Sequence, residues 1–148
     1  MSRILVVDDQ FGVRRMLVDA FRVDQHEVEM AENGTEALRL FISFEPDLIL
    51  LDMKMPGMDG IDTLKQIRAL DRRAPVIMMT AYGEPQNMEQ ANDLGIHYFM
   101  NKPFNLFGLR ERVREILNSS GIITQRIIQT QGNCHTENIK NRKSINAF

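Results

Sequence analysis

Residues 4–9 read Ile-Leu-Val-Val-Asp-Asp, and residues 48–52 read Leu-Ile-Leu-Leu-Asp. Each segment is a short apolar run that ends in carboxylates, and a third run at residues 98–100 is followed closely by Lys102. Unbroken apolar runs of this length are typical of strands that are buried on both faces of a parallel sheet. Because the carboxyl ends of such strands meet at one edge, we expect the acidic residues and the lysine to gather there.

Apolar runs of this kind alternate with amphipathic stretches along the chain. Apolar residues recur between the runs at helical spacing, as Leu17 and Phe21 do between the first two. Strict alternation of strand and helix favours a parallel sheet with helices on both faces. We predict a doubly wound α/β domain whose five-stranded parallel sheet has the order 2-1-3-4-5. The candidate strands lie near Ile4–Val7, Glu27–Met30, Asp47–Leu51, Pro75–Met79 and His97–Met100.

Charge and composition exclude several classes of protein. Residues 1–120 contain 14 basic and 19 acidic residues, and this mildly acidic body argues against nucleic-acid binding. No apolar run approaches the ~18 residues that a membrane span needs, and the N-terminus lacks a signal-peptide pattern. The single cysteine, Cys134, cannot form an internal disulfide, which fits a reducing compartment. We therefore expect a cytoplasmic protein with no nucleic-acid or membrane partner.

The end of the chain differs from the rest in composition. After Ser119-Ser120-Gly121 the sequence is rich in Gln, Asn, Ile and Thr and has no sustained apolar period. We predict a folded domain over residues 1–120 and a C-terminal extension over residues 121–148, which is too short to fold alone. The extension is either loosely held or a docking or dimerising segment. Its isoleucines suit a short helix or a strand: Ile122, Ile123, Ile127 and Ile128.

Three carboxylates at one sheet edge would repel one another unless a cation lay between them. A hard divalent ion, held by carboxylate oxygens, a carbonyl oxygen and water, meets that need. We therefore expect a Mg²⁺ cofactor at Asp8, Asp9 and Asp52, and Mn²⁺ or Ca²⁺ could substitute for it. A Mg²⁺ ion beside an aspartate and a lysine suits a site that receives a phosphoryl group, where positioning and charge neutralisation supply the catalysis.

Each of these residues alone has an ordinary structural explanation. Asp8-Asp9 suits a turn at a strand end or a helix cap, and Lys102 suits a solvated loop charge. The functional interpretation depends on four motifs that occur together and in order. These motifs are Val6-Val7-Asp8-Asp9, Leu50-Leu51-Asp52-Met53-Lys54-Met55-Pro56-Gly57-Met58-Asp59-Gly60, Met79-Thr80-Ala81 and Lys102-Pro103-Phe104.

In these motifs the chain, from Met1 to about Asn118, resembles the receiver domain of bacterial response regulators. The resemblance implies a flavodoxin-like fold in which Asp52 accepts a phosphoryl group from a phosphohistidine. It implies that Lys102 and Thr80 contact the phosphoryl oxygens, and that the Lys102–Pro103 peptide is cis. It also implies a Mg²⁺ site whose ligands are Asp8, Asp9, Asp52 and the backbone carbonyl of Lys54.

Two further segments, Asp9-Gln10-Phe11-Gly12 and residues 79–84, closely resemble the single-domain receivers of sporulation phosphorelays in endospore-forming bacteria. Such receivers take the phosphoryl group from sensor histidine kinases and pass it to a histidine phosphotransferase. Phe11, Phe99 and the long C-terminal extension depart from that pattern. The resemblance implies a phosphotransferase-docking surface formed by Gly12, Val13, Met16, Tyr82, Gly83, Pro103 and Phe104.

Other functions fit the same motifs less fully. A stand-alone or truncated receiver could regulate an effector by phosphorylation-dependent binding. A Mg²⁺-dependent phosphatase would place a second aspartate two residues after the nucleophile, where this chain has Lys54, so we predict a phosphoacceptor and not an enzyme. Lys54 and Tyr82 should hinder the attack of water and slow the loss of the phosphoryl group. Phe99 suits either a core position or a side chain that changes rotamer on phosphorylation.

Overall fold

A computed structural model of the protein describes residues 1–81 and 85–133. The chain divides into two compact units, Met1–Arg114 and Glu115–Phe148. The first unit contains the whole sheet and every described residue of the predicted phosphoacceptor site. The predicted boundary at residue 120 falls six residues beyond the end of this unit, and the assignment of residues 121–148 as an extension stays a prediction.

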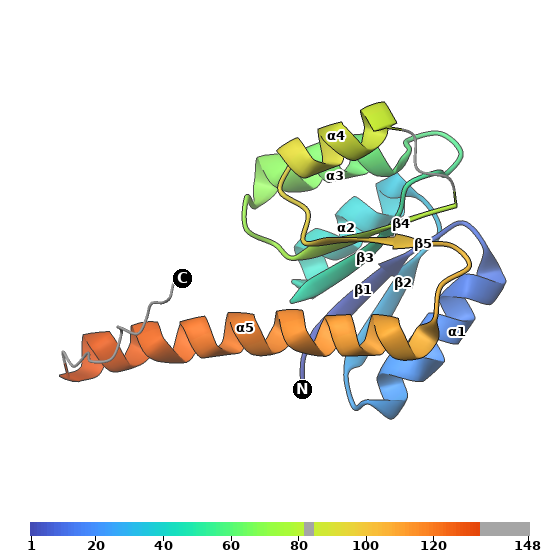
Figure 1. The fold of residues 1–148 in the computed structure, drawn as a ribbon. Helices are drawn as coiled ribbons and strands as arrows, with labels where there is room; N and C mark the ends of the chain where they lie inside the picture. The colour runs from blue at the N-terminus through green and yellow to red at the C-terminus, as the bar shows by residue number, and fades with distance from the viewer. Residues whose placement is uncertain (82–84, 134–148) are drawn as a thin grey trace. The chain divides into compact units, whose positions relative to one another are not determined.

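The sheet has five parallel strands in the order β2-β1-β3-β4-β5, which confirms the predicted topology. Figure 1 shows these strands in the centre of the first unit. Each predicted strand agrees with an observed one to within a residue at either end. The agreement is close because strands buried on both faces of a parallel sheet are short apolar runs in the sequence. The strands are β1 (Arg3–Val7), β2 (Glu27–Ala31), β3 (Leu48–Asp52), β4 (Val76–Thr80) and β5 (Tyr98–Asn101).

A helix follows each strand, and local signals set its ends. Pro85 is the first residue of α4, where a backbone N–H would have no partner within the helix, so its absence costs nothing. Gly95 follows that helix with a φ of +75°. The Asn33 side chain caps α2 by accepting a hydrogen bond from the backbone N–H of Glu36 at 2.8 Å. The helices are α1 (Phe11–Val23), α2 (Gly34–Phe44), α3 (Gly60–Leu70), α4 (Pro85–Asp93) and α5 (Leu106–Asn133).

The last helix is longer than the sequence pattern indicated. The sequence left the segment after Gly121 open between helix and strand, whereas α5 continues without a break to Asn133. Serine and glycine within a helix cost only about 0.5–1 kcal/mol each relative to alanine, so they do not by themselves stop one.

Among the described residues, no helix combines the length and the apolar character needed to cross a bilayer.

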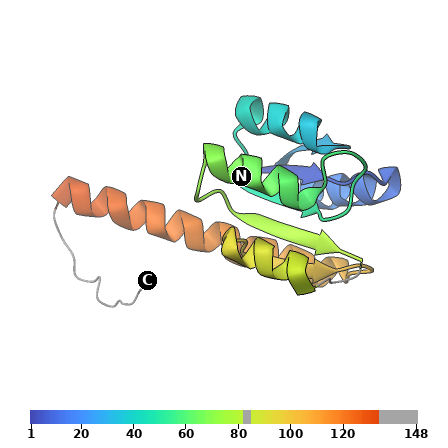
Figure 2. The ribbon, with the colours of Figure 1, turned by 90° about the horizontal axis from the view of Figure 1, so that it is seen from above.

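Two apolar layers cover the two faces of the sheet. Alternate residues of each strand point to opposite faces, so Leu5 and Val7 lie in one layer while Ile4 and Val6 lie in the other. The first layer packs beneath α2, α3 and α4, which lie side by side on one face in Figures 1 and 2. Every central strand is therefore buried on both sides, and polar chemistry is confined to the strand ends.

The start of α3 packs directly against the end of β3. The backbone N–H of Gly60 donates to the carbonyl of Met53 at 2.9 Å. A Cβ atom on Gly60 would lie only 2.3 Å from the backbone oxygen of Asp52, so no other residue fits this approach without displacing the strand end. Asp59 caps the helix by accepting a hydrogen bond from the N–H of Asp62 at 2.9 Å. This close packing fixes the backbone from which the Asp52 side chain extends.

Candidate functional site

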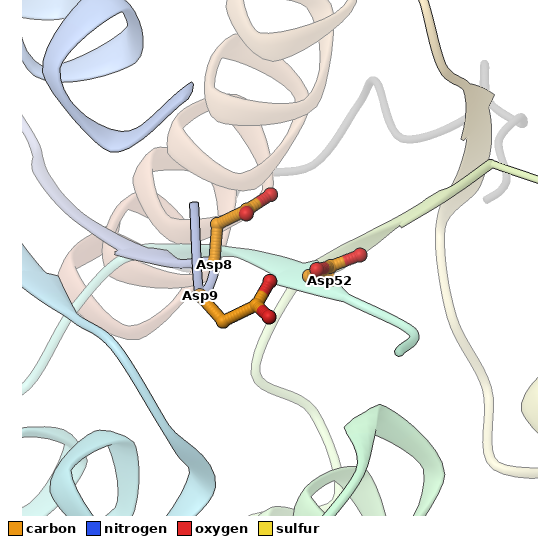
Figure 3. A group of neighbouring side chains, drawn as sticks. All are labelled: Asp8, Asp9 and Asp52. Carbon is orange, nitrogen blue, oxygen red and sulfur yellow. The ribbon is translucent and has the colours of Figure 1, made fainter. Parts of the chain in front are cut away.

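Three carboxylates meet at the carboxyl edge of the sheet. Asp8 and Asp9 follow β1 directly, and Asp52 is the last residue of β3. The two strands are neighbours in register, with Val7 opposite Leu51, so their ends bring the three side chains together. One carboxylate oxygen from each lies within 4.8 Å of the others, and Figure 3 shows the group. The expected gathering of these residues is therefore present, while their catalytic and metal-binding roles stay predictions.

Asp8 is the most firmly held member of the group. It is fully buried, and its backbone N–H donates to the carbonyl of Ala31 at 3.1 Å. Its Oδ1 accepts a hydrogen bond from the N–H of Gln10 at 2.9 Å, and its Oδ2 accepts one from Lys102 Nζ at 2.7 Å. A buried carboxylate needs such partners, because losing water without compensation costs several kcal/mol.

Lys102 approaches the acidic group from the turn after β5. Its Nζ lies 2.7 Å from Asp8 Oδ2, 3.4 Å from Asp52 Oδ1 and 3.4 Å from Gln10 Oε1. Its backbone N–H donates to the carbonyl of Thr80 at 2.7 Å, and the Lys102–Pro103 peptide is cis, as predicted. The lysine is therefore closer to Asp8 than to Asp52, and one ammonium serves two buried carboxylates.

Thr80 and Phe99 lie on the two strands beyond β3. Thr80 is the last residue of β4 and is fully buried, and it stands opposite Asn101 of β5 in the register. Phe99 is half-buried and packs against the apolar layer beneath α2, α3 and α4. This packing is that of a core residue, and the change of rotamer on phosphorylation stays a prediction.

The environment of Asp52 makes its carboxyl group a weaker acid than an aspartate in water. Burial raises the pKa of the Asp52 carboxyl to about 6, and the neighbouring charge of Asp8 adds to this rise. Lys102 and a hydrogen bond from the backbone of Lys54 act in the opposite direction but do not cancel it. Among the described residues, the three carboxylates thus carry more negative charge than the Lys102 ammonium balances.

Stability should depend on pH through this group. The folded protein holds the Asp52 proton more tightly than the unfolded chain, whose pKa is near 3.8, so stability should fall as pH rises from about 4 to about 6 and stay level above that. About two pH units at ~1.4 kcal/mol each give an effect of roughly 3 kcal/mol. In urea unfolding with a chelator present, Asp52→Asn should lose this pH dependence and be the more stable protein at pH 7.5. If the stability of the two proteins depended on pH in the same way, the raised pKa of Asp52 would be contradicted.

The residues present fit a hard divalent cation. Such an ion takes oxygen ligands, and the three carboxylates supply them within a small volume. The excess of carboxylate charge over the Lys102 ammonium favours the entry of a cation, in the same direction as the raised pKa of Asp52. Lys54 lies two residues beyond Asp52, exposed between buried Met53 and Met55. By the family resemblance we propose its backbone carbonyl as a further ligand.

The predicted docking surface is described only in part. Gly12 and Met16 are exposed at the start of α1, and Val13 beside them is half-buried. In the turn after Lys102, Pro103 is exposed and Phe104 is half-buried. Tyr82 and Gly83 lie outside the described residues. The surface therefore stays a prediction.

Two neighbours of the acidic group did not come out of the sequence analysis. Gln10 contacts both Asp8 and Lys102, and Arg14 donates from Nη1 to the backbone carbonyl of Asp8 at 2.8 Å. Gln10 belongs to the segment Asp9-Gln10-Phe11-Gly12 that carries the family resemblance, but nothing in that segment indicated its contacts with Asp8 and Lys102. Arg14 did give one, because it lies three and four residues before Leu17 and Val18 on the buried face of α1. A charged residue at such a position indicates a buried partner.

Fold and site together define a flavodoxin-like α/β protein with a cluster of three carboxylates at its topological switch point. A family model described as "Response regulator receiver domain" matches residues 4–114. The chain belongs to this family of receiver domains. Receivers are phosphoacceptor proteins, and they bind Mg²⁺ through an acidic pocket.

Individual proteins and solved structures agree with this assignment. The chain is 42% identical over 116 residues to the sporulation initiation phosphotransferase F of Bacillus subtilis (strain 168), a match that covers 78% of this chain and 94% of that protein. It is also 42% identical over 131 residues to the regulatory protein AtoC of Escherichia coli (strain K12), covering 88% of this chain but only 26% of AtoC. A CheY-like receiver domain protein from Methanospirillum hungatei JF-1 superposes with a TM-score of 0.78 at 28% identity, over 80% of this chain and 95% of that one.

Proposed function

We propose that this chain is a phosphorelay intermediate. It accepts a phosphoryl group on Asp52 from a sensor histidine kinase and passes it to a histidine phosphotransferase. The observation that carries the proposal is the match to almost the full length, 94%, of a protein named as a sporulation initiation phosphotransferase. By this similarity the relay controls entry into sporulation, and it operates in the cytoplasm, where histidine kinases expose their phosphohistidine.

The chemistry follows from the placement of charge around Asp52. An oxygen of Asp52 attacks the phosphorus of the donor phosphohistidine, and the bond between phosphorus and nitrogen breaks. Lys102 lies 3.4 Å from Asp52 Oδ1, so its ammonium can follow a phosphoryl oxygen as negative charge develops there. A Mg²⁺ ion held by Asp8, Asp9 and Asp52 would supply further neutralisation of negative charge at the site. The hydroxyl of Thr80, at the end of the adjacent strand, donates a hydrogen bond to the transferred group.

The two directions of transfer need no further catalytic group on this chain. Phosphohistidine and aspartyl phosphate are both high-energy species, so a site that supplies positioning and charge serves in both directions. The partner's histidine is the leaving group in the first step and the nucleophile in the second. Kinase and phosphotransferase must therefore present their histidines to the same face, which we place around the start of α1 and the turn at Pro103.

Labelled phosphate tests the relay directly. The chain should take label from a phosphorylated sensor histidine kinase in the presence of Mg²⁺, and should lose it when an unlabelled histidine phosphotransferase is added. The purified phosphotransferase should carry the label afterwards, and the reverse reaction should return it. Labelling without onward transfer to any histidine phosphotransferase would refute the relay.

A relay must also hold its phosphoryl group until the next partner docks. Hydrolysis needs water in line with the Asp52–phosphorus bond, and exposed Lys54 in the following loop neither accepts a proton nor orients that water. Lys54→Asn should supply an amide that positions the water, as a glutamine does in GTPases, and should speed hydrolysis about tenfold, or ~1.4 kcal/mol. The check is the loss of label from both Mg²⁺-bound phosphoproteins, with Lys65→Asn on α3 as the matched control. A parent half-life of seconds, or equal rates for parent and Lys54→Asn, would contradict the kinetic role.

A second function is favoured by one specific observation. A match to AtoC that covers 131 residues of a 148-residue chain has to extend beyond residue 114, and α5 likewise continues to Asn133. The chain could thus act as the receiver part of a longer regulator, whose output depends on phosphorylation of Asp52. In that case phosphorylation should change binding to an effector, and no histidine phosphotransferase should remove the label.

A further inference from the structure

Arg14 is a charged residue in a buried place. It lies at the end of the first turn of α1, on the face that also carries Leu17, Val18 and Phe21, and its side chain is only 10% exposed. Arginine is seldom buried to this extent without partners, because removing its charge from water is costly. Its contacts therefore identify what the protein gains from this burial.

Three contacts hold the guanidinium. Nη1 donates to the backbone carbonyl of Asp8 at 2.8 Å, and Nη2 lies 3.8 Å from a carboxylate oxygen of Glu32. The ring of Phe11 covers the guanidinium, 5.6 Å from its centroid to the Arg14 Cζ atom. The Glu32 side chain is 64% exposed, so that ion pair contributes little to stability. The bond to the Asp8 carbonyl is short, buried and charge-assisted, and it is the strongest of the three.

Among the described residues, Arg14 bonds the Asp8 carbonyl, whereas the other polar groups of Asp8 have partners elsewhere in the site. The N–H of Asp8 is bound to Ala31, and its two carboxylate oxygens are bound to Gln10 and Lys102. The carbonyl belongs to the planar peptide that joins Asp8 to Asp9. A donor that fixes this carbonyl fixes the rotation of the peptide, and with it the direction in which the exposed Asp9 side chain leaves the backbone.

We propose that Arg14 is a positioning residue for divalent-cation binding, which acts by holding the Asp8–Asp9 peptide in the orientation that aims Asp9 at the cation. The proposal rests on the proposed function, because it concerns the Mg²⁺ site that phosphotransfer requires. Arg14 contributes no ligand atom. It sets the spacing between the carboxylate oxygens of Asp9 and those of Asp8 and Asp52, on which a small ion with strict geometry depends.

Positioning and charge predict opposite effects, which makes the proposal testable. A guanidinium near the site repels a divalent cation, so if Arg14 acted only through its charge, its removal would strengthen metal binding. If Arg14 holds the peptide, its removal weakens binding even though a repulsive charge has gone. The sign of the change in affinity therefore separates the two roles.

The experiment measures Mn²⁺ binding to the metal-free full-length protein by calorimetry, with Mn²⁺ as the probe. Arg14→Met keeps a long unbranched apolar side chain and removes every donor, and it should weaken Mn²⁺ binding about tenfold. Arg14→Lys keeps the charge and one donor group, and it should lie between parent and Arg14→Met. Arg15→Met is the matched control, since it removes an equal charge from the next residue, which is exposed and paired with Asp19, and its affinity should equal that of the parent.

Folding is monitored separately by circular dichroism and thermal unfolding in excess chelator. If Arg14→Met does not fold, the intermediate affinity of Arg14→Lys decides. Unchanged or tighter Mn²⁺ binding in folded Arg14→Met, or in Arg14→Lys where that variant decides, would overturn the inference while leaving the proposed function intact. A parent protein that binds no Mn²⁺ would overturn both.

Discussion

Asp52→Ala should abolish phosphorylation of the protein completely. Asp52 combines a position at the end of β3, near-complete burial and a lysine ammonium 3.4 Å from its carboxylate. Asp8 is equally buried, but its two carboxylate oxygens are occupied by Gln10 and Lys102 and cannot serve as the nucleophile without losing those bonds. The raised pKa of Asp52 does not prevent the reaction, because at pH 7.5 a carboxyl with a pKa of about 6 is mostly ionised.

The measurement is mass spectrometry of the intact protein after incubation with acetyl phosphate and Mg²⁺. The parent should gain one phosphoryl group, and Asp52→Ala should gain none. Asp93→Ala, which removes an exposed carboxylate from the end of α4, is the matched control and should label like the parent. Parent protein in excess chelator should remain unlabelled. Retained labelling of Asp52→Ala, or full labelling without a divalent ion, would refute the assignment of this site.

The second large effect is expected for Lys102→Ala. Its ammonium is placed to meet the developing charge on a phosphoryl oxygen, and losing one such preorganised donor typically slows a reaction by about 10²–10³-fold, or ~3–4 kcal/mol. Phosphotransfer from both acetyl phosphate and a phosphorylated kinase should fall by this factor. Stopped-flow or gel-based labelling at saturating Mg²⁺ measures the rate, and Lys65→Ala on the exposed face of α3 is the control. A transfer rate within a few-fold of the parent would contradict the role.

Lys102→Ala should also destabilise the metal-free protein, which the sequence alone did not suggest. Lys102 Nζ lies 2.7 Å from a carboxylate oxygen of Asp8, which is fully buried. Removing one partner of a buried pair leaves an uncompensated charge and typically costs about 3–5 kcal/mol. Thermal unfolding in chelator should therefore show a lower midpoint than for Lys65→Ala, and added Mg²⁺ should recover part of the difference. The loss of rate must then be measured on the folded, Mg²⁺-saturated variant.

The sequence by itself determined the sheet and the meeting of the acidic residues. The apolar runs that became β1 and β3 are local signals, and each ends in carboxylates, so neighbouring parallel strands had to bring Asp8, Asp9 and Asp52 to one edge. Helix ends were equally local, because Pro85 and Gly95 act through their own backbone geometry. The motif context also placed Lys102 in the site, since the turn that carries it follows a strand of the same sheet.

Only the tertiary structure decided how these charged groups are paired. Lys102 and Asp8 are 94 residues apart in the sequence, and β3 and β4 lie between the strands that precede them. Their 2.7 Å contact therefore depends on how far the Lys102 side chain reaches along the carboxyl edge of the sheet. The partner of Arg14 is a backbone carbonyl. Every residue has such a group, so residue types do not indicate which one Arg14 bonds. Whether two side chains form a hydrogen bond or ion pair depends on differences of a few tenths of an ångström in the distance between their atoms. Sequence patterns specify only which face or strand end a residue occupies.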